Sequence, residues 1–97
     1  MEIEFEDKKL ERKLATLAKA KKAFGDKVGG MIFYRINQLE VALDESELHY
    51  IPGNFHPLTA DRKGQWACSL TANWRMVFRL KIEEDYIAVI IEIVDYH

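Results

Sequence analysis

The feature that most constrains the fold is the apolar run from Tyr86 to Val94. Alternate side chains of an extended strand point to opposite faces of a sheet. One face of this run would carry Ile87, Val89, Ile91 and Ile93, and the other Ala88, Ile90 and Val94. Because both faces are apolar, we expect the strand to lie in the centre of a sheet or to be covered by a partner.

Two further strands are predicted directly before this run, over residues 65–70 and 74–81. They are separated by the polar turns at residues 71–73 and 83–85. On the middle strand, Trp74, Met76, Phe78 and Leu80 alternate with Arg75, Val77, Arg79 and Lys81. One face of the sheet is therefore expected to pack under helices, and the other to carry positive charge.

The first half of the chain predicts a short strand over Ile3–Phe5 and two helices. Asp7 is placed to cap the first helix and Gly25 to end it. The apolar stripe of this helix consists of Leu10, Leu14, Leu17 and Phe24. Asp26 is placed to cap the second helix, whose apolar side consists of Val28, Ile32, Ile36, Leu39 and Leu43. A further short turn is expected from Ser46 to Tyr50.

These elements predict an α+β domain in the order β-α-α-β-β-β, with two antiparallel helices on one side of a small antiparallel sheet. A chain of 97 residues has room for one domain, residues 1–97. No apolar run approaches the length that spans a membrane, and the first residues lack a signal-peptide pattern, so we expect a cytoplasmic location. The single Cys68 is expected to be an inert core thiol.

The charge balance argues against nonspecific binding to nucleic acid. The formal net charge is −2 and the pI is near 5.9, whereas nonspecific affinity depends on Lys and Arg that neutralise phosphates. Charge can nevertheless be segregated within a fold. A basic ridge on the first helix is formed by Lys8, Arg12, Lys19 and Lys22. It is interpreted either as a solvated face or as a surface for RNA or an acidic partner.

Candidate catalytic groups lie on the loop after Pro52-Gly53 and at the end of the chain. Pro57 biases His56 toward an extended backbone that can present its imidazole. Histidine can transfer protons near neutral pH, and fixed cations stabilise a phosphate. His56 and His97 as acid/base groups, with Arg62, Arg75 and Arg79 as fixed cations, are the parts that RNA phosphodiester cleavage requires. Lys63 is a further cation beside Arg62, and Asp95 and Tyr96 lie beside His97 at a sheet edge where they can meet a ligand.

Each candidate has a structural alternative. His56 could be a loop histidine bonded to its own turn, Arg62 could pair with Asp61, and the last three residues could be a frayed terminus. His49 is interpreted as an ordinary turn histidine. The three histidines and one cysteine show no zinc-ligand spacing, so no metal site is expected.

Three blocks, HPLTADRKGQW, ANWRMVF and the terminal VDYH, closely resemble the HigB branch of the RelE/ParE toxin superfamily. The resemblance covers the second half of the chain with order and spacing intact, and the first half in pattern only. It implies a metal- and cofactor-independent endoribonuclease that cuts mRNA in the ribosomal A site. It assigns the family's catalytic histidine to His56 and its C-terminal set to Asp95, Tyr96 and His97.

The resemblance also implies a HigA-type helix-turn-helix antitoxin, through which the toxin contacts DNA only indirectly. One departure lies inside the motif: many relatives have Lys-Gly where this chain has Thr59 and Ala60. That lost cation and the acidic balance favour a second hypothesis, a weak or inactive binding module that acts as an antitoxin-bound co-repressor. A third, a ParE-like gyrase inhibitor, would not need paired acid/base groups.

Overall fold

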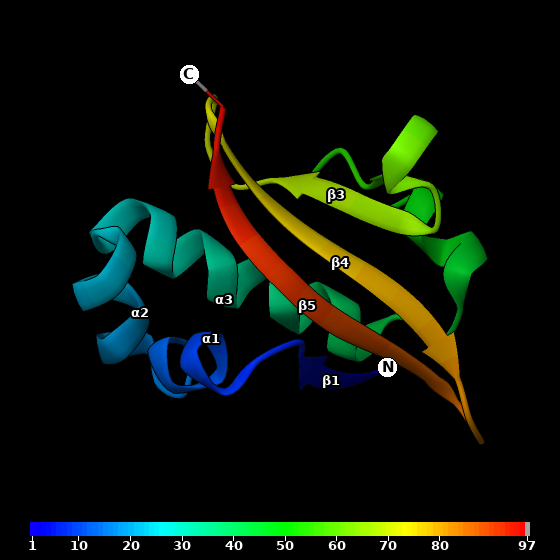
Figure 1. Cartoon of the computed structure of the whole chain (residues 1–97), viewed down its shortest axis with the longest axis horizontal. Helices are drawn as coiled ribbons and strands as arrows, with labels where there is room; N and C mark the ends of the chain where they lie inside the picture. Colours follow the sequence, from blue (N-terminus) through cyan, green and yellow to red (C-terminus); the bar gives the residue numbers. More distant parts are fainter. Residues whose placement is uncertain (97) are drawn as a thin grey trace.

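The computed structural model describes residues 1–96, so the terminal His97 lies outside the described residues. Five strands form one sheet in the order β1-β5-β4-β3-β2 (Figure 1). They are β1 (Glu2–Phe5), β2 (His56–Pro57), β3 (Gln65–Ser69), β4 (Trp74–Ile82) and β5 (Tyr86–Asp95). The helices are α1 (Lys8–Lys13), α2 (Leu17–Phe24) and α3 (Asp26–Val41), with the 3₁₀ turns η1 (Glu45–His49) and η2 (Ala60–Arg62).

The predicted α+β fold class is confirmed, and so is the central position of the last strand. β5 lies between β1 and β4, which explains why both of its faces are apolar. The sheet departs from the prediction in two respects. The segment His56–Pro57, expected to be a loop, forms the short strand β2 beside β3. β2 to β5 are antiparallel, but β1 runs parallel to β5. The sheet is therefore mixed.

The first helix was predicted to be continuous, and this prediction is wrong. The structure breaks it between α1 and α2, because Thr16 starts a new helix by accepting a hydrogen bond from the Lys19 N–H at 3.1 Å. The Asp7 cap and the Gly25 stop are confirmed. The predicted cap of the second helix is also wrong. Gly25 occupies that position, and Asp26 lies in the first turn of α3.

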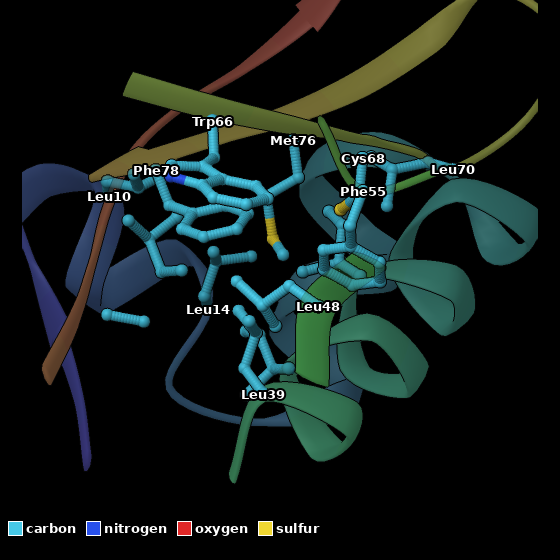
Figure 2. Packing of buried hydrophobic residues seen from close by; sticks show 14 of the residues in the cluster. Leu10, Leu14, Leu39, Leu48, Phe55, Trp66, Cys68, Leu70, Met76 and Phe78 are labelled. Atoms are coloured by element: carbon cyan, nitrogen blue, oxygen red, sulfur yellow. The ribbon is translucent and has the colours of Figure 1, made fainter. Parts of the chain in front are cut away.

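The core lies between the helices and one face of the sheet (Figure 2). Sheet residues Trp66, Cys68, Met76 and Phe78 meet Leu10, Leu14, Leu39 and Leu48 from the helical layer. Cys68 is fully buried, as expected of a core thiol, and burial raises its pKa to about 12. Within residues 1–96 no helix is long and apolar enough to cross a membrane.

The face of the sheet turned away from this core is called the open face below. Alternation along β4 places Arg75, Val77 and Arg79 on it, because Met76 and Phe78 belong to the core. On β5 the alternation changes at a bulge. The partners shift from Phe78↔Ile90 to Val77↔Glu92, which leaves Ile91 as the extra residue. Ile93 therefore packs against the core beside Ile90, whereas simple alternation had placed it with Ile87 and Val89.

Candidate functional site

The loop that carries His56 is shaped by two residues with positive φ. Gly53 has φ +120° and Asn54 has φ +55°, so the chain reverses sharply after Pro52. Phe55 is then buried, with its ring centroid 6.0 Å from that of Phe78 in an edge-on contact. The buried Phe55 fixes the start of β2, and His56 follows half-buried.

A buried arginine on α3 holds this loop. Arg35 is 9% exposed, and its Nε donates to the Ser69 carbonyl at 2.7 Å while an Nη donates to Gln38 Oε1 at 3.0 Å. The Gln38 amide donates in turn to the Pro52 carbonyl at 2.8 Å. The Ser69 N–H donates to the Gly53 carbonyl at 2.8 Å. The loop is therefore attached to both α3 and β3.

The imidazole of His56 has one defined partner. Its Nδ1 lies 2.8 Å from the Asn54 carbonyl oxygen, which can only accept a hydrogen bond. Nδ1 therefore carries the proton, and in the neutral ring Nε2 is the acceptor. This contact is the bond to its own turn that the structural alternative for His56 describes. It also fixes the tautomer that a general base would use at Nε2, so the contact is compatible with both interpretations.

The strand register places His56 in a row that crosses the sheet. His56 pairs with Ala67, Ala67 with Val77, and Val77 with Glu92. Directly paired residues of antiparallel strands project from the same face. Because Val77 belongs to the open face, His56 and Glu92 mark the two ends of a row on that face. Ala67 and Val77 form its floor, and both are buried even though they lie outside the helix-covered core.

Arg62 spans this row from the η2 loop. Its Nε donates to Gln65 Oε1 on β3 at 2.9 Å, and an Nη donates to Glu92 Oε1 on β5 at 2.7 Å. The guanidinium thus bridges β3 and β5 across β4, above the floor. The hydrogen bond and ion pair with Glu92 raise the pKa of Arg62, and the negative charge of Asp61 adds to this increase. Arg62 pairs with Glu92, whereas the sequence had offered Asp61 as the alternative partner.

The other predicted cations lie around the floor or on the loop. Arg75 and Arg79 flank Val77 on β4. One Nη of Arg75 donates to the carbonyls of Thr71, Ala72 and Trp74 at 2.9, 3.2 and 3.0 Å, which secures the β3–β4 turn. Arg79 reaches Glu6 at 3.4 Å on the β1 side. Lys63 is exposed in the loop before Gly64.

The C-terminal residues lie beside the β3–β4 turn. β5 runs to Asp95, and the Tyr96 N–H donates to the Asn73 carbonyl at 2.8 Å. Tyr96 is half exposed. The backbone is therefore held through Tyr96, which argues against a frayed terminus up to that residue. The fourth predicted catalytic residue, His97, lies outside the described residues.

Within residues 1–96 no three His, Cys, Asp or Glu side chains gather to form a metal-binding group. His49 is exposed, and its ring centroid lies 5.3 Å from that of Trp66. It lies on η1, apart from the row that contains His56.

Two residues of this arrangement were not singled out from the sequence. Arg35 shares the apolar side of α3 with Ile32, Ile36 and Leu39, and a charge at that spacing is a sign of a buried anchor. Glu92 is the single charge between Ile87 and Val94. A lone carboxylate in a central strand is the sequence feature that could have singled out Glu92.

The fold matches solved toxin structures. The YoeB/ParE toxin from Agrobacterium tumefaciens superposes with a TM-score of 0.68 over 100% of both chains at 16% sequence identity. A single-substitution mutant of YafQ from E. coli superposes with a TM-score of 0.61 over 97% of this chain and 91% of the other at 17% identity. These neighbours show that the chain shares its fold with the YoeB/ParE toxin and with YafQ.

A relative adds a match in sequence. The endoribonuclease HigB of Proteus vulgaris is 36% identical over 63 residues, which cover 65% of this chain and 65% of HigB, just under two thirds of each. No family model matches the chain. The chain is therefore similar in sequence to HigB and in fold to the YoeB/ParE toxin and YafQ, which supports the resemblance stated from the sequence.

Proposed function

We propose that the protein is the toxin of a type II toxin–antitoxin pair and acts as a ribosome-dependent endoribonuclease that cleaves mRNA in the A site. The reaction is attack of the 2′-hydroxyl on the adjacent phosphate, which needs a base, an acid and charge stabilisation. His56 and His97 share the two proton transfers, and Tyr96 contacts the nucleotide. Asp95 pairs with Trp74, whose side chain packs against the core, so it projects to the face opposite His56 and is assigned to orienting the end of the chain rather than His56. Arg62 stabilises the phosphate, assisted by Lys63, Arg75 and Arg79, without a metal or cofactor.

The observation that carries this proposal is the row across the open face. It places an imidazole with an acceptor Nε2 on the same face as the guanidinium of Arg62. The small floor of Ala67 and Val77 leaves the polar groups at its rim. The name of the Proteus vulgaris relative, an endoribonuclease, supports the same chemistry.

The same family supports a partner. We propose a HigA-type helix-turn-helix antitoxin that neutralises this protein and through which it contacts DNA indirectly. A ribosomal substrate would place the protein in the cytoplasm.

The decisive experiment is primer extension on a messenger translated in vitro, with and without the purified protein. Discrete cuts that require ribosomes and disappear in a His56→Ala, His97→Ala double variant are expected. Cleavage of naked messenger at the same rate would refute the ribosome dependence. Cuts that persist in the double variant would refute the assignment of the histidines.

One observation favours the alternative of a weak binding module that acts as a co-repressor. Arg62, Arg75 and Arg79 all have partners within the protein, so the cations of the open face are already engaged. An uncut messenger in the presence of folded protein would support this alternative. Growth arrest when the protein is expressed alone would argue against it.

A further inference from the structure

The open face carries a carboxylate where an enzyme of RNA would be expected to keep positive charge. Glu92 lies at the β5 end of the row and holds Arg62 at 2.7 Å. The side chains of the pair are 35% and 40% exposed, so solvent and a ligand can reach both. Two similar pairs lie nearer to β1, Arg79–Glu6 at 3.4 Å and Lys81–Glu4 at 3.0 Å.

The position of Glu92 on this face depends on the β5 bulge. Continued alternation from Ala88 and Ile90 would direct residue 92 into the core, and the extra residue Ile91 directs it to the open face instead. Bulges are a recognised means of re-aiming a side chain beside a functional site. The backbone irregularity thus brings a carboxylate to Arg62.

Carboxylate and phosphate compete for the same donors. A guanidinium offers a planar fork of N–H groups that fits either anion. The hydrogen bond to Glu92 uses one of these donors, and the negative charge of Glu92 repels a second anion placed beside it. The contact between Arg62 and Gln65 does not involve Glu92, so the guanidinium retains one anchor when Glu92 leaves.

We propose that Glu92 is an internal competitor of the substrate phosphate for Arg62. An RNA phosphate binds in the row only by displacing the Glu92 carboxylate from the guanidinium, and Glu92 thereby lowers the affinity of the site for RNA. This inference rests on the proposed function for the identity of the ligand. No covalent bond is broken in the exchange, since one ionic partner of Arg62 replaces another.

The test compares the binding of one probe to matched variants. The probe is a 2′-O-methyl RNA trinucleotide, which lacks the attacking hydroxyl and cannot be cleaved, and its Kd is measured by NMR titration. Glu92→Gln removes the charge and keeps the size of the side chain. Glu4→Gln is the control, because it removes one carboxylate from the same face with a similar side-chain exposure, 45% against 40%.

Glu92→Gln is expected to bind the probe about tenfold more tightly than the wild type, and Glu4→Gln less than about threefold more tightly. Adding Arg62→Gln to Glu92→Gln should abolish the gain. Equal gains in affinity in the two single variants would show that the gain comes from the change in net charge alone, and would overturn the proposal. Weaker binding by Glu92→Gln would also overturn it, because Glu92 would then be holding Arg62 in its binding position.

Folding of each variant is checked by urea unfolding, and Glu92→Met replaces Glu92→Gln if the latter does not fold. The outcome is separable from that of the proposed function. If Glu92→Gln binds tightly but neither it nor the wild type cuts a translated messenger, the competition stands and the enzyme assignment fails. If the wild type cuts and Glu92→Gln binds no more tightly, the enzyme assignment stands and the competition fails.

Discussion

The attachment of the His56 loop to Arg35 makes Gly53 the most informative position for a substitution. Gly53 has φ +120°, and a Cβ atom added there would lie 2.8 Å from both Cζ and Nε of Arg35. The guanidinium is not free to move away, because it is buried and donates to Ser69 and Gln38. Gly53→Ala must therefore strain the backbone and also displace a hydrogen-bonded charge.

Gly64 separates these two effects. It has φ +94° in the same loop region, but a Cβ atom there meets nothing within 4 Å. Gly64→Ala should therefore show the backbone effect alone, about 1–2 kcal/mol of lost stability. Gly53→Ala should lose about 2 kcal/mol more, because a hydrogen bond from a charged donor contributes about 1.5–3 kcal/mol.

The assay is equilibrium urea unfolding of the wild type and the two variants, with the free energy of unfolding as the measured quantity. An NMR spectrum of the His56 ring should shift in Gly53→Ala and remain in place in Gly64→Ala. Equal losses of stability in the two variants would refute the reasoning. Arg35 would then move aside without a penalty and could not be what fixes the His56 loop.

Three further predictions concern the rest of the chain. Ala60 has φ +58°, so Ala60→Gly should raise the free energy of unfolding by about 1 kcal/mol in urea titrations, and a loss would contradict this. Gly29→Ala should destabilise by about 3 kcal/mol, since its Cβ would lie 2.6 Å from the Lys21 backbone nitrogen, whereas the control Gly30→Ala should stabilise by about 1 kcal/mol. The pKa of Cys68 is raised from 9.0 to about 12 by burial, so the unfolded chain loses this proton first as pH rises. Stability relative to a Cys68→Ala variant should then fall by about 1.4 kcal/mol per pH unit between these values, and a flat difference would refute the shift.

Most of the fold could be predicted from periodicity, because most strands and helices have one clear apolar face and the last strand has two. The break at Thr16 was missed for a local reason. The apolar stripe of Leu10, Leu14 and Leu17 is compatible with a continuous helix, and only the hydroxyl bond of Thr16 to the Lys19 N–H starts a second one. The parallel β1–β5 pair depends on tertiary packing, which residue patterns do not specify.

The candidate site was predictable in its residue types but not in its partners. His56 and Arg62 belong to recognisable sequence blocks, whereas Glu92 reaches Arg62 only through the register shift at Ile91. A shift of one residue moves every following side chain to the other face. Sequence periodicity could not locate that shift, because Ile90, Ile91 and Ile93 are apolar on either register.

The backbone conformation at Ala60 bears on the departure from the motif at Thr59 and Ala60. Ala60 adopts the left-handed φ of +58° that glycine favours, so a glycine at this position would fit the loop without strain. The alanine therefore keeps this backbone conformation at a small energetic cost.

The distribution of charge also explains how an acidic protein could act on RNA. The chain between Lys8 and Lys27 carries eight Lys and Arg residues and only two carboxylates, so α1 and α2 are strongly basic although the net charge is −2. Around Val77, in contrast, the side-chain charges of Arg62 and Arg79 are each balanced by a carboxylate. Paired charges exert little long-range attraction on RNA, and these two cations become available only when their partners are displaced. This pairing would suit the proposed function, in which the ribosome delivers and positions the substrate.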